Sequence, residues 1–212
     1  MQDYKQVPLI IPSLEPDEKL PRLLEQLKAA GIQNIVLVDD GSGPEYAPFF
    51  ADAASRHGCV VLRHAVNLGK GRALKTAFNY CLNTWPNAVG CVTADSDGQH
   101  TPACILRVME ALCQHPGSLV LGVRDFSGKD VPARSSFGNR ITCGVFRFLV
   151  GLTISDTQTG LRAVPAGYMR ALLQSRGERF EFESNMLIDT KENEVPILEV
   201  PIETVYIEEN RT

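Results

Sequence analysis

The chain has 212 residues, of which 44% are hydrophobic, and it carries a formal net charge of -4 at pH 7. This length and composition predict one compact domain with a substantial core. The charges are mixed and form no basic block, which argues against a nucleic-acid binder that must neutralise many phosphates.

The six cysteines lie far apart, mostly within apolar runs, and no two of them form a Cys-x-x-Cys pair. They therefore predict buried thiols in a reducing compartment and no zinc site. The sequence contains no basic segment followed by a long apolar stretch, so no secretory signal is expected. It contains no run of about 18 apolar residues, so no membrane-spanning segment is predicted within it.

Short β-rich runs alternate with helical patterns in the first part of the chain. Strand-like runs occupy 7–12, 34–42, 59–64, 88–98 and 118–124, and helical patterns occupy 17–31, 67–82 and 101–115, with a polar helix between 42 and 59. Thr101 followed by Pro102 is typical of a helix N-cap and first turn. The alternation predicts an α/β fold with a mostly parallel central sheet flanked by helices on both faces.

The pattern changes after Arg124. Residues 125–136 are polar and rich in turn formers, which predicts a mobile loop at the edge of the sheet. Residues 137–154 predict an unusually apolar helix, whose part from 145 to 154 either packs on the core or lies at a membrane interface. The remaining elements are a strand at 156–164, helices at 167–173 and 181–191, and a final strand at 197–209.

Two of the predicted strands end in carboxylates. Asp39 and Asp40 close the second strand, and Asp95 and Asp97 close the fourth. Ligands bind outside the carboxyl ends of strands in open parallel sheets, and strand alternation would turn Asp95 and Asp97 to one side. Oxygen ligands of this kind suit Mg²⁺ or Mn²⁺. The alternative is a simple polar turn, because Asp and Gly are common in turns.

A glycine-rich loop opens the third helix. Gly69-Lys70-Gly71 stands at its predicted N-terminus, where backbone N–H groups and the helix dipole favour an anion. The alternative is a simple helix-entry loop.

Four motifs follow one another in a characteristic order and spacing: IIPSLEPDEKL, VLVDDGS, NLGKGRALKTAF and TADSDGQH. This set resembles the family 2 glycosyltransferases of the GT-A fold. The later motifs DTQTGLRAV, FEFESNMLI and VPIETVYIEEN are similar to those of polyprenyl-phosphate sugar synthases, a group that includes dolichol-phosphate mannose synthase. The resemblance covers nearly the whole chain. It implies a single GT-A catalytic domain over 1–212, with a nucleotide-sugar-binding half at 1–123 and an acceptor-binding half at 124–212.

The resemblance also implies an activity. The chain would transfer a hexose, with inversion, from a UDP- or GDP-linked sugar to a polyprenyl phosphate carrier at the cytoplasmic face of the membrane. It would need Mg²⁺ or Mn²⁺. Proteins of the group often continue into membrane-associated segments, so the resemblance implies that the chain is the catalytic part of a longer membrane-associated protein.

The expected site divides into three groups of residues. Asp39 would contact the nucleotide base, and Asp95 and Asp97 would hold the metal and the diphosphate together with Gln99. The full nucleotide-sugar site would comprise Pro12, Ser13, Glu15, Asp39, Asp40, Gly69, Lys70, Gly71, Asp95 and Ser96. The loop after the first strand departs from the family pattern, because Leu14-Glu15-Pro16 stands where Asn-Glu is usual, and Glu15 would keep the acidic contact. The acceptor phosphate would be bound by Arg124, Arg134, Arg140 and Arg162.

The acceptor decides which catalytic groups are needed. A sugar hydroxyl must lose a proton to a base, whereas a phosphate monoester is largely dianionic near neutrality and needs cations. Arginine suits phosphate because its planar group remains charged. Asp97, Asp156 and Arg124 are the predicted catalytic residues. Asp156 is expected to orient an arginine if the acceptor is a phosphate, and to act as a base if it is a hydroxyl.

Several alternatives remain open from the sequence. Arg140 can be a surface residue, and Glu181 and Glu183 can either take part in the chemistry or cap a helix. The chain can transfer sugar to a hydroxyl in polysaccharide synthesis. A nucleotidyltransferase also pairs carboxylates with Mg²⁺, but it typically has a glycine-rich basic loop after its first strand, where this chain has IIPSLEPDEK. The last alternative is a non-catalytic regulator that binds nucleotide sugars.

Overall fold

The computed structural model of the chain describes residues 4–124, 142–144 and 146–203. The predicted loop at 125–136, Arg134, Arg140 and the end of the last predicted strand lie outside these residues. Seven strands form one sheet in the order β3-β2-β1-β4-β6-β5-β7. They are β1 (Leu9–Ser13), β2 (Ile35–Asp39), β3 (Val60–Arg63), β4 (Gly90–Thr93), β5 (Leu119–Arg124), β6 (Arg162–Pro165) and β7 (Ile197–Ile202).

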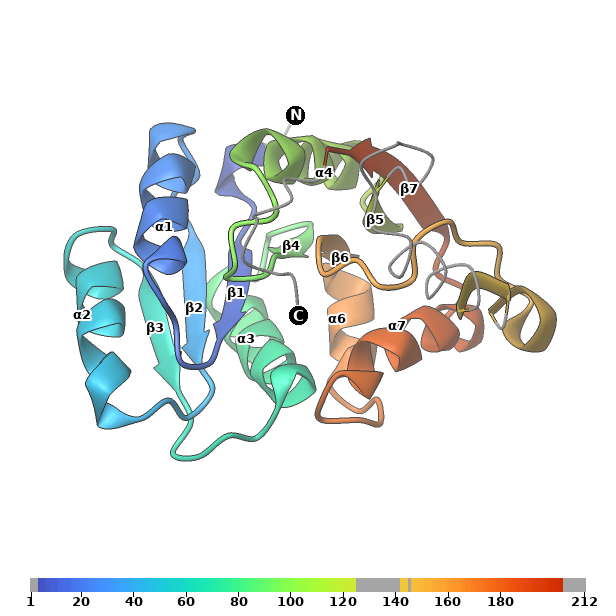
Figure 1. Cartoon of the computed structure of the whole chain (residues 1–212). Helices are drawn as coiled ribbons and strands as arrows, with labels where there is room; N and C mark the ends of the chain where they lie inside the picture. The colour runs from blue at the N-terminus through green and yellow to red at the C-terminus, as the bar shows by residue number, and fades with distance from the viewer. Residues whose placement is uncertain (1–3, 125–141, 145, 204–212) are drawn as a thin grey trace, which may run out of the picture.

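Helices cover both faces of this sheet (Figure 1). They are α1 (Lys19–Ala29), α2 (Ala47–Ser55), α3 (Lys70–Thr84), α4 (Pro102–Gln114), α6 (Ala166–Leu172) and α7 (Glu181–Glu192), with short turns η1 (Tyr4–Gln6), η2 (Pro44–Tyr46) and η3 (Phe146–Val150). Among the described strands, β6 runs antiparallel to both of its neighbours, β4 and β5, and the other pairs are parallel. The predicted α/β class and mostly parallel sheet are confirmed.

The sheet has a hydrophobic core on each face because neighbouring residues of a strand point to opposite sides. Leu9 and Ile11 of β1 pack with α1, α2 and α4, whereas Ile10 packs with α3, α6 and α7. Such strands are hydrophobic at nearly every position, as the sequence of β2 shows. Burial on both faces explains why the chain forms this layered architecture.

The order of the strands reverses next to β1. After β1 the chain adds β2 and then β3 on one side, and it returns through α3 to place β4 on the other side of β1. In open α/β sheets this switch point leaves a crevice at the carboxyl ends of the two diverging strands. Ser13 ends β1 and Thr93 ends β4, so the loops that follow these residues define the expected binding site.

Three local predictions are tested within the described residues. The N-cap at Thr101 is confirmed, because its hydroxyl accepts the backbone N–H of Cys104 at 3.3 Å. The helix predicted to run to residue 154 is wrong at its end, because the π-helical turn η3 stops at Val150 and Gly151 adopts a φ of +67°. The strand predicted at 156–164 starts only at Arg162.

No helix within the described residues is long and apolar enough to cross a membrane. All six cysteines fall within these residues and are thiols rather than disulfides. Four of them are buried, as predicted, whereas Cys113 and Cys143 are partly exposed.

Candidate active site

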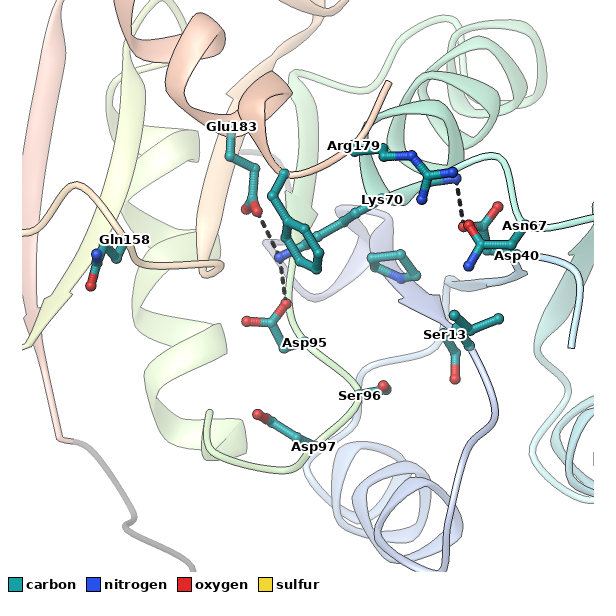
Figure 2. A pocket seen from close by; sticks show the side chains of 14 residues that line it. Ser13, Asp40, Asn67, Lys70, Asp95, Ser96, Asp97, Gln158, Arg179 and Glu183 are labelled. Carbon is teal, nitrogen blue, oxygen red and sulfur yellow. Dashed lines mark hydrogen bonds and ion pairs between the residues drawn. The ribbon is translucent and has the colours of Figure 1, made fainter. Parts of the chain in front are cut away.

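A pocket of about 490 Å³ lies at the switch point, beyond the carboxyl ends of β1 and β4 (Figure 2). It is lined by Pro12, Ser13, Leu14, Asp40, Asn67, Gly69, Lys70, Asp95, Ser96, Asp97, Gln158, Arg179, Phe180 and Glu183. Most of the predicted nucleotide-sugar residues are therefore brought together. Gln158, Arg179, Phe180 and Glu183 come from the half of the chain for which the sequence predicted acceptor binding.

Lys70 lies at the centre of the charges in the pocket. Its ammonium nitrogen donates a hydrogen bond to Asp95 Oδ1 at 2.7 Å and lies 2.8 Å from Glu183 Oε2 (Figure 2). On the other side of Asp95, the His100 Nε2 atom lies 3.6 Å from Oδ2. Three segments, namely the start of α3, the loop after β4 and the first turn of α7, thus meet at one cation.

These contacts keep Lys70 and Asp95 charged. Burial is the largest influence on the pKa of Lys70 and acts to lower it, but the charges and hydrogen bonds of Asp95 and Glu183 together raise this pKa above its ordinary value. For Asp95, burial acts in the opposite direction and raises the pKa. His100 and the ammonium group of Lys70 nevertheless hold this pKa well below the ordinary value of 3.8.

The acidic triplet follows β4 but is not part of it. β4 ends at Thr93, and Asp95, Ser96 and Asp97 line the pocket from the following loop and turn. The expectation that strand alternation aligns the two carboxylates is therefore wrong, and the turn places them in one pocket instead. Asp97 Oδ1 accepts the backbone N–H of Gln99 at 3.0 Å.

The carboxylates of Asp95 and Asp97 fit a hard divalent cation by their chemistry. Within the described residues, no group of three or more His, Cys, Asp or Glu side chains is arranged to hold a metal by itself. Mg²⁺ typically takes one or two carboxylates and completes its shell with water and substrate phosphates. Gln99 does not line the pocket, so its predicted contact with the metal remains a prediction.

Asp40 binds the loop that opens α3. Its carboxylate accepts the backbone N–H groups of Leu68 at 3.0 Å and Gly69 at 2.8 Å, and it contacts His64 Nδ1 at 2.7 Å. The backbone N–H of Arg72 is bound by the carbonyl of Glu178 at 2.8 Å. The prediction that backbone groups of this loop hold a substrate anion is therefore wrong for these amides, because a buried carboxylate of the protein already binds two of them.

The glycines of the same loop allow two segments to approach closely. Gly69 has a φ of +103°, and a Cβ atom there would lie 2.5 Å from the Glu178 carbonyl oxygen. A Cβ atom on Gly71 would lie 2.5 Å from Cβ of Phe182. Gly71 does not line the pocket, so its demonstrated role is the packing of α3 against the start of α7.

Asp39 lies behind the pocket rather than in its lining. It is fully buried, where Oδ1 accepts the backbone N–H of Ser42 at 2.8 Å and Oδ2 accepts Arg63 Nε at 2.8 Å. Glu15 is exposed with a φ of 49°, and its backbone N–H donates to Ser42 Oγ. Neither residue lines the pocket, so the predicted contacts of both with the nucleotide remain predictions.

Ser13 presents a buried hydroxyl to the pocket. The residue is only 3% exposed, and its Oγ atom has no hydrogen-bond partner in the part of the chain that the structure describes. A buried polar atom of this kind is uncommon and marks a place where a ligand or water binds. Ser13 and its neighbour Pro12 both line the pocket, as predicted.

Asp156 holds Arg124 in a fixed orientation. Its two oxygens accept Nε at 2.7 Å and Nη2 at 3.0 Å from Arg124, and they also accept backbone N–H groups of Arg124 and Gln158. Asp156 is fully buried, whereas the side chain of Arg124 is 20% exposed. This geometry agrees with the orienting role expected for a phosphate acceptor. Neither residue lines the pocket described above.

Arg162 is a structural residue. It is 1% exposed, and its guanidinium donates to the carbonyls of Thr159, Glu183 and Thr157 at 2.9, 2.6 and 3.2 Å. Its predicted contact with an acceptor phosphate is therefore wrong, because the guanidinium is enclosed and its N–H groups are bound to backbone. Arg134 and Arg140 lie outside the described residues, and their roles remain predictions.

Sequence reasoning missed part of the pocket. Leu14, Asn67, Gln158, Arg179 and Phe180 line it but were not predicted, and His100 was not predicted as a neighbour of Asp95. His100 stands inside the TADSDGQH motif, which was the available signal. The two glutamates of FEFES differ in role: Glu181 accepts backbone N–H groups of residues 178 and 179, whereas Glu183 enters the pocket.

Comparisons with known proteins identify a family. The sequence profile of a family described as Glycosyl transferase family 2 matches residues 9–176. The UDP-N-acetylglucosamine–dolichyl-phosphate N-acetylglucosaminyltransferase of Methanococcus voltae is 28% identical over 96% of this chain and 87% of its own length. The undecaprenyl-phosphate mannosyltransferase of Micrococcus luteus is 30% identical over 91% of this chain and 81% of its own length.

A solved structure shows the same fold. Glucosyl-3-phosphoglycerate synthase from Mycobacterium tuberculosis, in complex with Mn²⁺, uridine diphosphate and phosphoglyceric acid, superposes with a TM-score of 0.73. The match covers 98% of this chain and 72% of the other, at 16% sequence identity. At this identity the comparison supports the fold alone, and that fold is GT-A.

Proposed function

The chain belongs to glycosyl transferase family 2, and from this premise we propose that it moves a hexose from a nucleoside-diphosphate sugar to a polyprenyl phosphate. Family membership makes the chain a glycosyltransferase, so the nucleotidyltransferase and non-catalytic alternatives are set aside. The relatives from Methanococcus voltae and Micrococcus luteus are named for dolichyl-phosphate and undecaprenyl-phosphate substrates, which supports a lipid-linked phosphate as the acceptor.

One observation carries the assignment of the sugar-donor site. The switch-point pocket combines two carboxylates, Asp95 and Asp97, with the ammonium of Lys70 and the buried hydroxyl of Ser13, which has no hydrogen-bond partner among the described residues. A nucleoside diphosphate needs a polar anchor for its nucleoside and cationic neutralisation for its phosphates. Ser13 and Pro12 would bind the nucleoside end, with UDP and GDP both open as the nucleotide, and the acidic triplet would face the diphosphate.

Asp95 and Asp97 would hold Mg²⁺ or Mn²⁺. The bound ion would offset the charge that develops on the departing nucleoside diphosphate. Lys70, held beside Asp95, would contribute a second positive charge at the phosphates. The backbone N–H of Gln99 already orients Asp97 for this role.

Arg124 would bind the phosphate of the acceptor. Asp156 fixes the orientation of its guanidinium by two parallel hydrogen bonds. A phosphate monoester oxygen needs no base near neutrality. It would attack the anomeric carbon from the side opposite the diphosphate, and this single displacement inverts the configuration there.

The hydroxyl-acceptor alternative requires a carboxylate that can take a proton. Asp156 accepts four N–H groups, and Glu183 contacts the ammonium of Lys70, so the oxygens of both already have partners in the described structure. This observation favours the phosphate acceptor.

A polyprenyl phosphate would bring the site to the cytoplasmic face of a membrane, where lipid-linked glycans are assembled. The turn η3 supports such contact because its two phenylalanines face different surroundings. Phe146 is buried in the core, whereas Phe148 is 85% exposed beside the exposed Arg147. An exposed aromatic beside a cation suits a lipid interface.

The proposal is tested by thermal shift and by transfer assays. UDP, GDP and their sugars are added with Mn²⁺, and the ligand that is bound raises the Tm. Transfer of sugar to a short polyprenyl phosphate is then measured for the wild type, Asp97→Ala and the surface control Asp17→Ala, whose carboxylate is 62% exposed. We expect Asp97→Ala to lower kcat/KM by roughly 100-fold or more. Full metal-dependent transfer by Asp97→Ala would contradict the proposal.

A further inference from the structure

Lys70 contacts the carboxylate that the metal would need. Its ammonium nitrogen lies 2.7 Å from Asp95 Oδ1, and His100 Nε2 lies 3.6 Å from Asp95 Oδ2. Both oxygens of Asp95 therefore face nitrogen atoms of the protein. A divalent cation cannot approach Oδ1 closely while the ammonium group remains there, because the two positive charges would repel each other.

A second carboxylate is positioned to pair with the ammonium group of Lys70 when this group moves away from Asp95. Glu183 Oε2 lies 2.8 Å from the same ammonium nitrogen, and its side chain is only 14% exposed. A small rotation of Lys70 would release Asp95 without taking its charge into an unpaired environment. Figure 2 shows the nitrogen between the two carboxylates, with dashed lines to both.

Glu183 is rigidly placed. It lies in the first turn of α7, and the segment before α7 is attached to α3 through Lys75. Buried Lys75 donates to the carbonyls of Ser175 at 2.6 Å and Gly177 at 2.9 Å and lies 3.0 Å from Glu178 Oε1. Because α3 also carries Lys70, the same packing fixes the positions of Lys70 and Glu183 relative to each other.

We propose that Lys70 and Glu183 form a counter-cation switch: Lys70 neutralises Asp95 until a divalent cation binds Asp95, and Glu183 then retains Lys70. This inference rests on the proposed function, since it assumes that Asp95 is a metal ligand. Glu183 is then a positioning residue that acts on the metal site through Lys70.

The switch predicts how the two ligands depend on each other. The metal alone must displace Lys70 from Asp95, so it binds weakly. A nucleoside diphosphate supplies anionic oxygens beside Lys70 and compensates for the lost contact with Asp95. Metal and nucleotide should therefore bind cooperatively, and by linkage each should raise the affinity of the other by the same factor.

The experiment measures Mn²⁺ binding by electron paramagnetic resonance, without turnover, in the presence and absence of UDP or GDP. For Lys70→Met we expect Mn²⁺ alone to bind about fivefold more tightly, the effect of losing one partly exposed ion pair, and the cooperativity with nucleotide to fall. The matched control is Arg179→Gln, which removes an exposed cation from the same pocket. Its Mn²⁺ affinity should change less than about twofold.

A double-mutant cycle tests the role of Glu183. Glu183→Gln should weaken the binding of Mn²⁺ alone. Lys70 then loses its contact with the carboxylate of Glu183, so moving it away from Asp95 costs more free energy. The same change made in the Lys70→Met background should have less than half that effect, since Glu183 acts through Lys70. A full and additive effect would overturn the inference, and so would an equal gain in affinity from Arg179→Gln or no gain from Lys70→Met.

The outcome separates this inference from the proposed function. If wild-type protein binds no Mn²⁺ even with UDP or GDP, the proposed metal-dependent sugar-donor site is wrong, and the switch falls with it. If Mn²⁺ and nucleotide bind together but Lys70→Met leaves the binding of Mn²⁺ alone unchanged, only the switch is wrong. Each variant is first checked for folding by its Tm, and Lys70→Gln replaces Lys70→Met if the latter does not fold.

Discussion

Asp156 and Arg124 form a fork of two hydrogen bonds, from Nε to Oδ2 at 2.7 Å and from Nη2 to Oδ1 at 3.0 Å. The carboxylate is fully buried and the side chain of Arg124 is 20% exposed, so the pair fixes a partly exposed cation at the end of β5. Bidentate pairs of this kind provide orientation as well as charge.

Replacing Asp156 by Asn should impair the acceptor side of the reaction. Asn keeps the size of the side chain but removes the charge and one acceptor of the fork, so Arg124 loses its orientation. We expect the KM for polyprenyl phosphate to rise about tenfold, the cost of a charge-assisted hydrogen bond, with the KM for the nucleotide sugar nearly unchanged. Steady-state kinetics with each substrate varied in turn measure both values. A rise confined to the nucleotide sugar would argue against this assignment.

Removing the carboxylate of Asp40 should destabilise the fold. Asp40→Ala removes the partner of the backbone N–H groups of Leu68 and Gly69 and of His64 Nδ1, in places that are buried or partly buried. The free energy of unfolding should fall by about 2–4 kcal/mol, measured by urea denaturation. Glu25→Ala is the control, because it removes a side chain that is 66% exposed and lies 3.9 Å from the equally exposed Arg56. That variant should lose no more than about 0.5–1 kcal/mol.

Adding a methyl group at Gly71 should disrupt the packing of α3 against α7. The new Cβ atom would lie 2.5 Å from Cβ of Phe182 and 2.8 Å from the carbonyl carbon of Glu178. We expect Gly71→Ala to cost about 1–3 kcal/mol of unfolding free energy. Gly167→Ala serves as the control, since Gly167 lies in α6 and a methyl group added there would meet no atom within 4 Å. It should leave stability unchanged or raise it by up to about 1 kcal/mol. Equal losses in both variants would contradict the close-packing argument.

The contact between Lys70 and Asp95 should make the free energy of unfolding depend on pH in the acidic range. The pKa of Asp95 lies below its ordinary value of 3.8 in the folded protein, so the folded state binds this proton less readily than the unfolded state. Its contribution to stability is complete above about pH 4 and is lost as the pH falls through the lowered folded pKa. The stability difference between wild type and Lys70→Met should therefore narrow below about pH 4. Urea denaturation between pH 6 and 2 measures the free energy of unfolding of both proteins. A difference between them that grows as the pH falls would refute the argument.

Several features could be predicted from the sequence because they depend on neighbouring residues. The hydrophobic runs predicted the strands, since a strand buried on both faces is apolar at each position. Thr101 and Pro102 predicted the start of α4, because capping is decided within one turn. The carboxylates at the ends of the second and fourth predicted strands predicted the edge of the sheet where the pocket lies, since α/β order puts those ends at one edge.

Other features depended on segments distant in sequence. No local pattern distinguishes Arg162, which is enclosed by backbone carbonyls, from Arg124, which is partly exposed beside Asp156. Asp39 and Asp40 are adjacent in sequence, yet only Asp40 lines the pocket. The degree of burial and the identity of the partner are set by packing between elements, which sequence patterns alone do not describe.

By itself, the sequence determined the layered α/β architecture, the family and the place of the acidic triplet, because periodicity and motif order are properties of the chain. Only the tertiary structure decided that the ammonium of Lys70 lies between Asp95 and Glu183, and that Asp40 rather than a substrate binds the amides before α3. The physical reason is that short-range electrostatic contacts require atoms within a few ångströms, and folding alone brings the ends of α3, β4 and α7 to that distance.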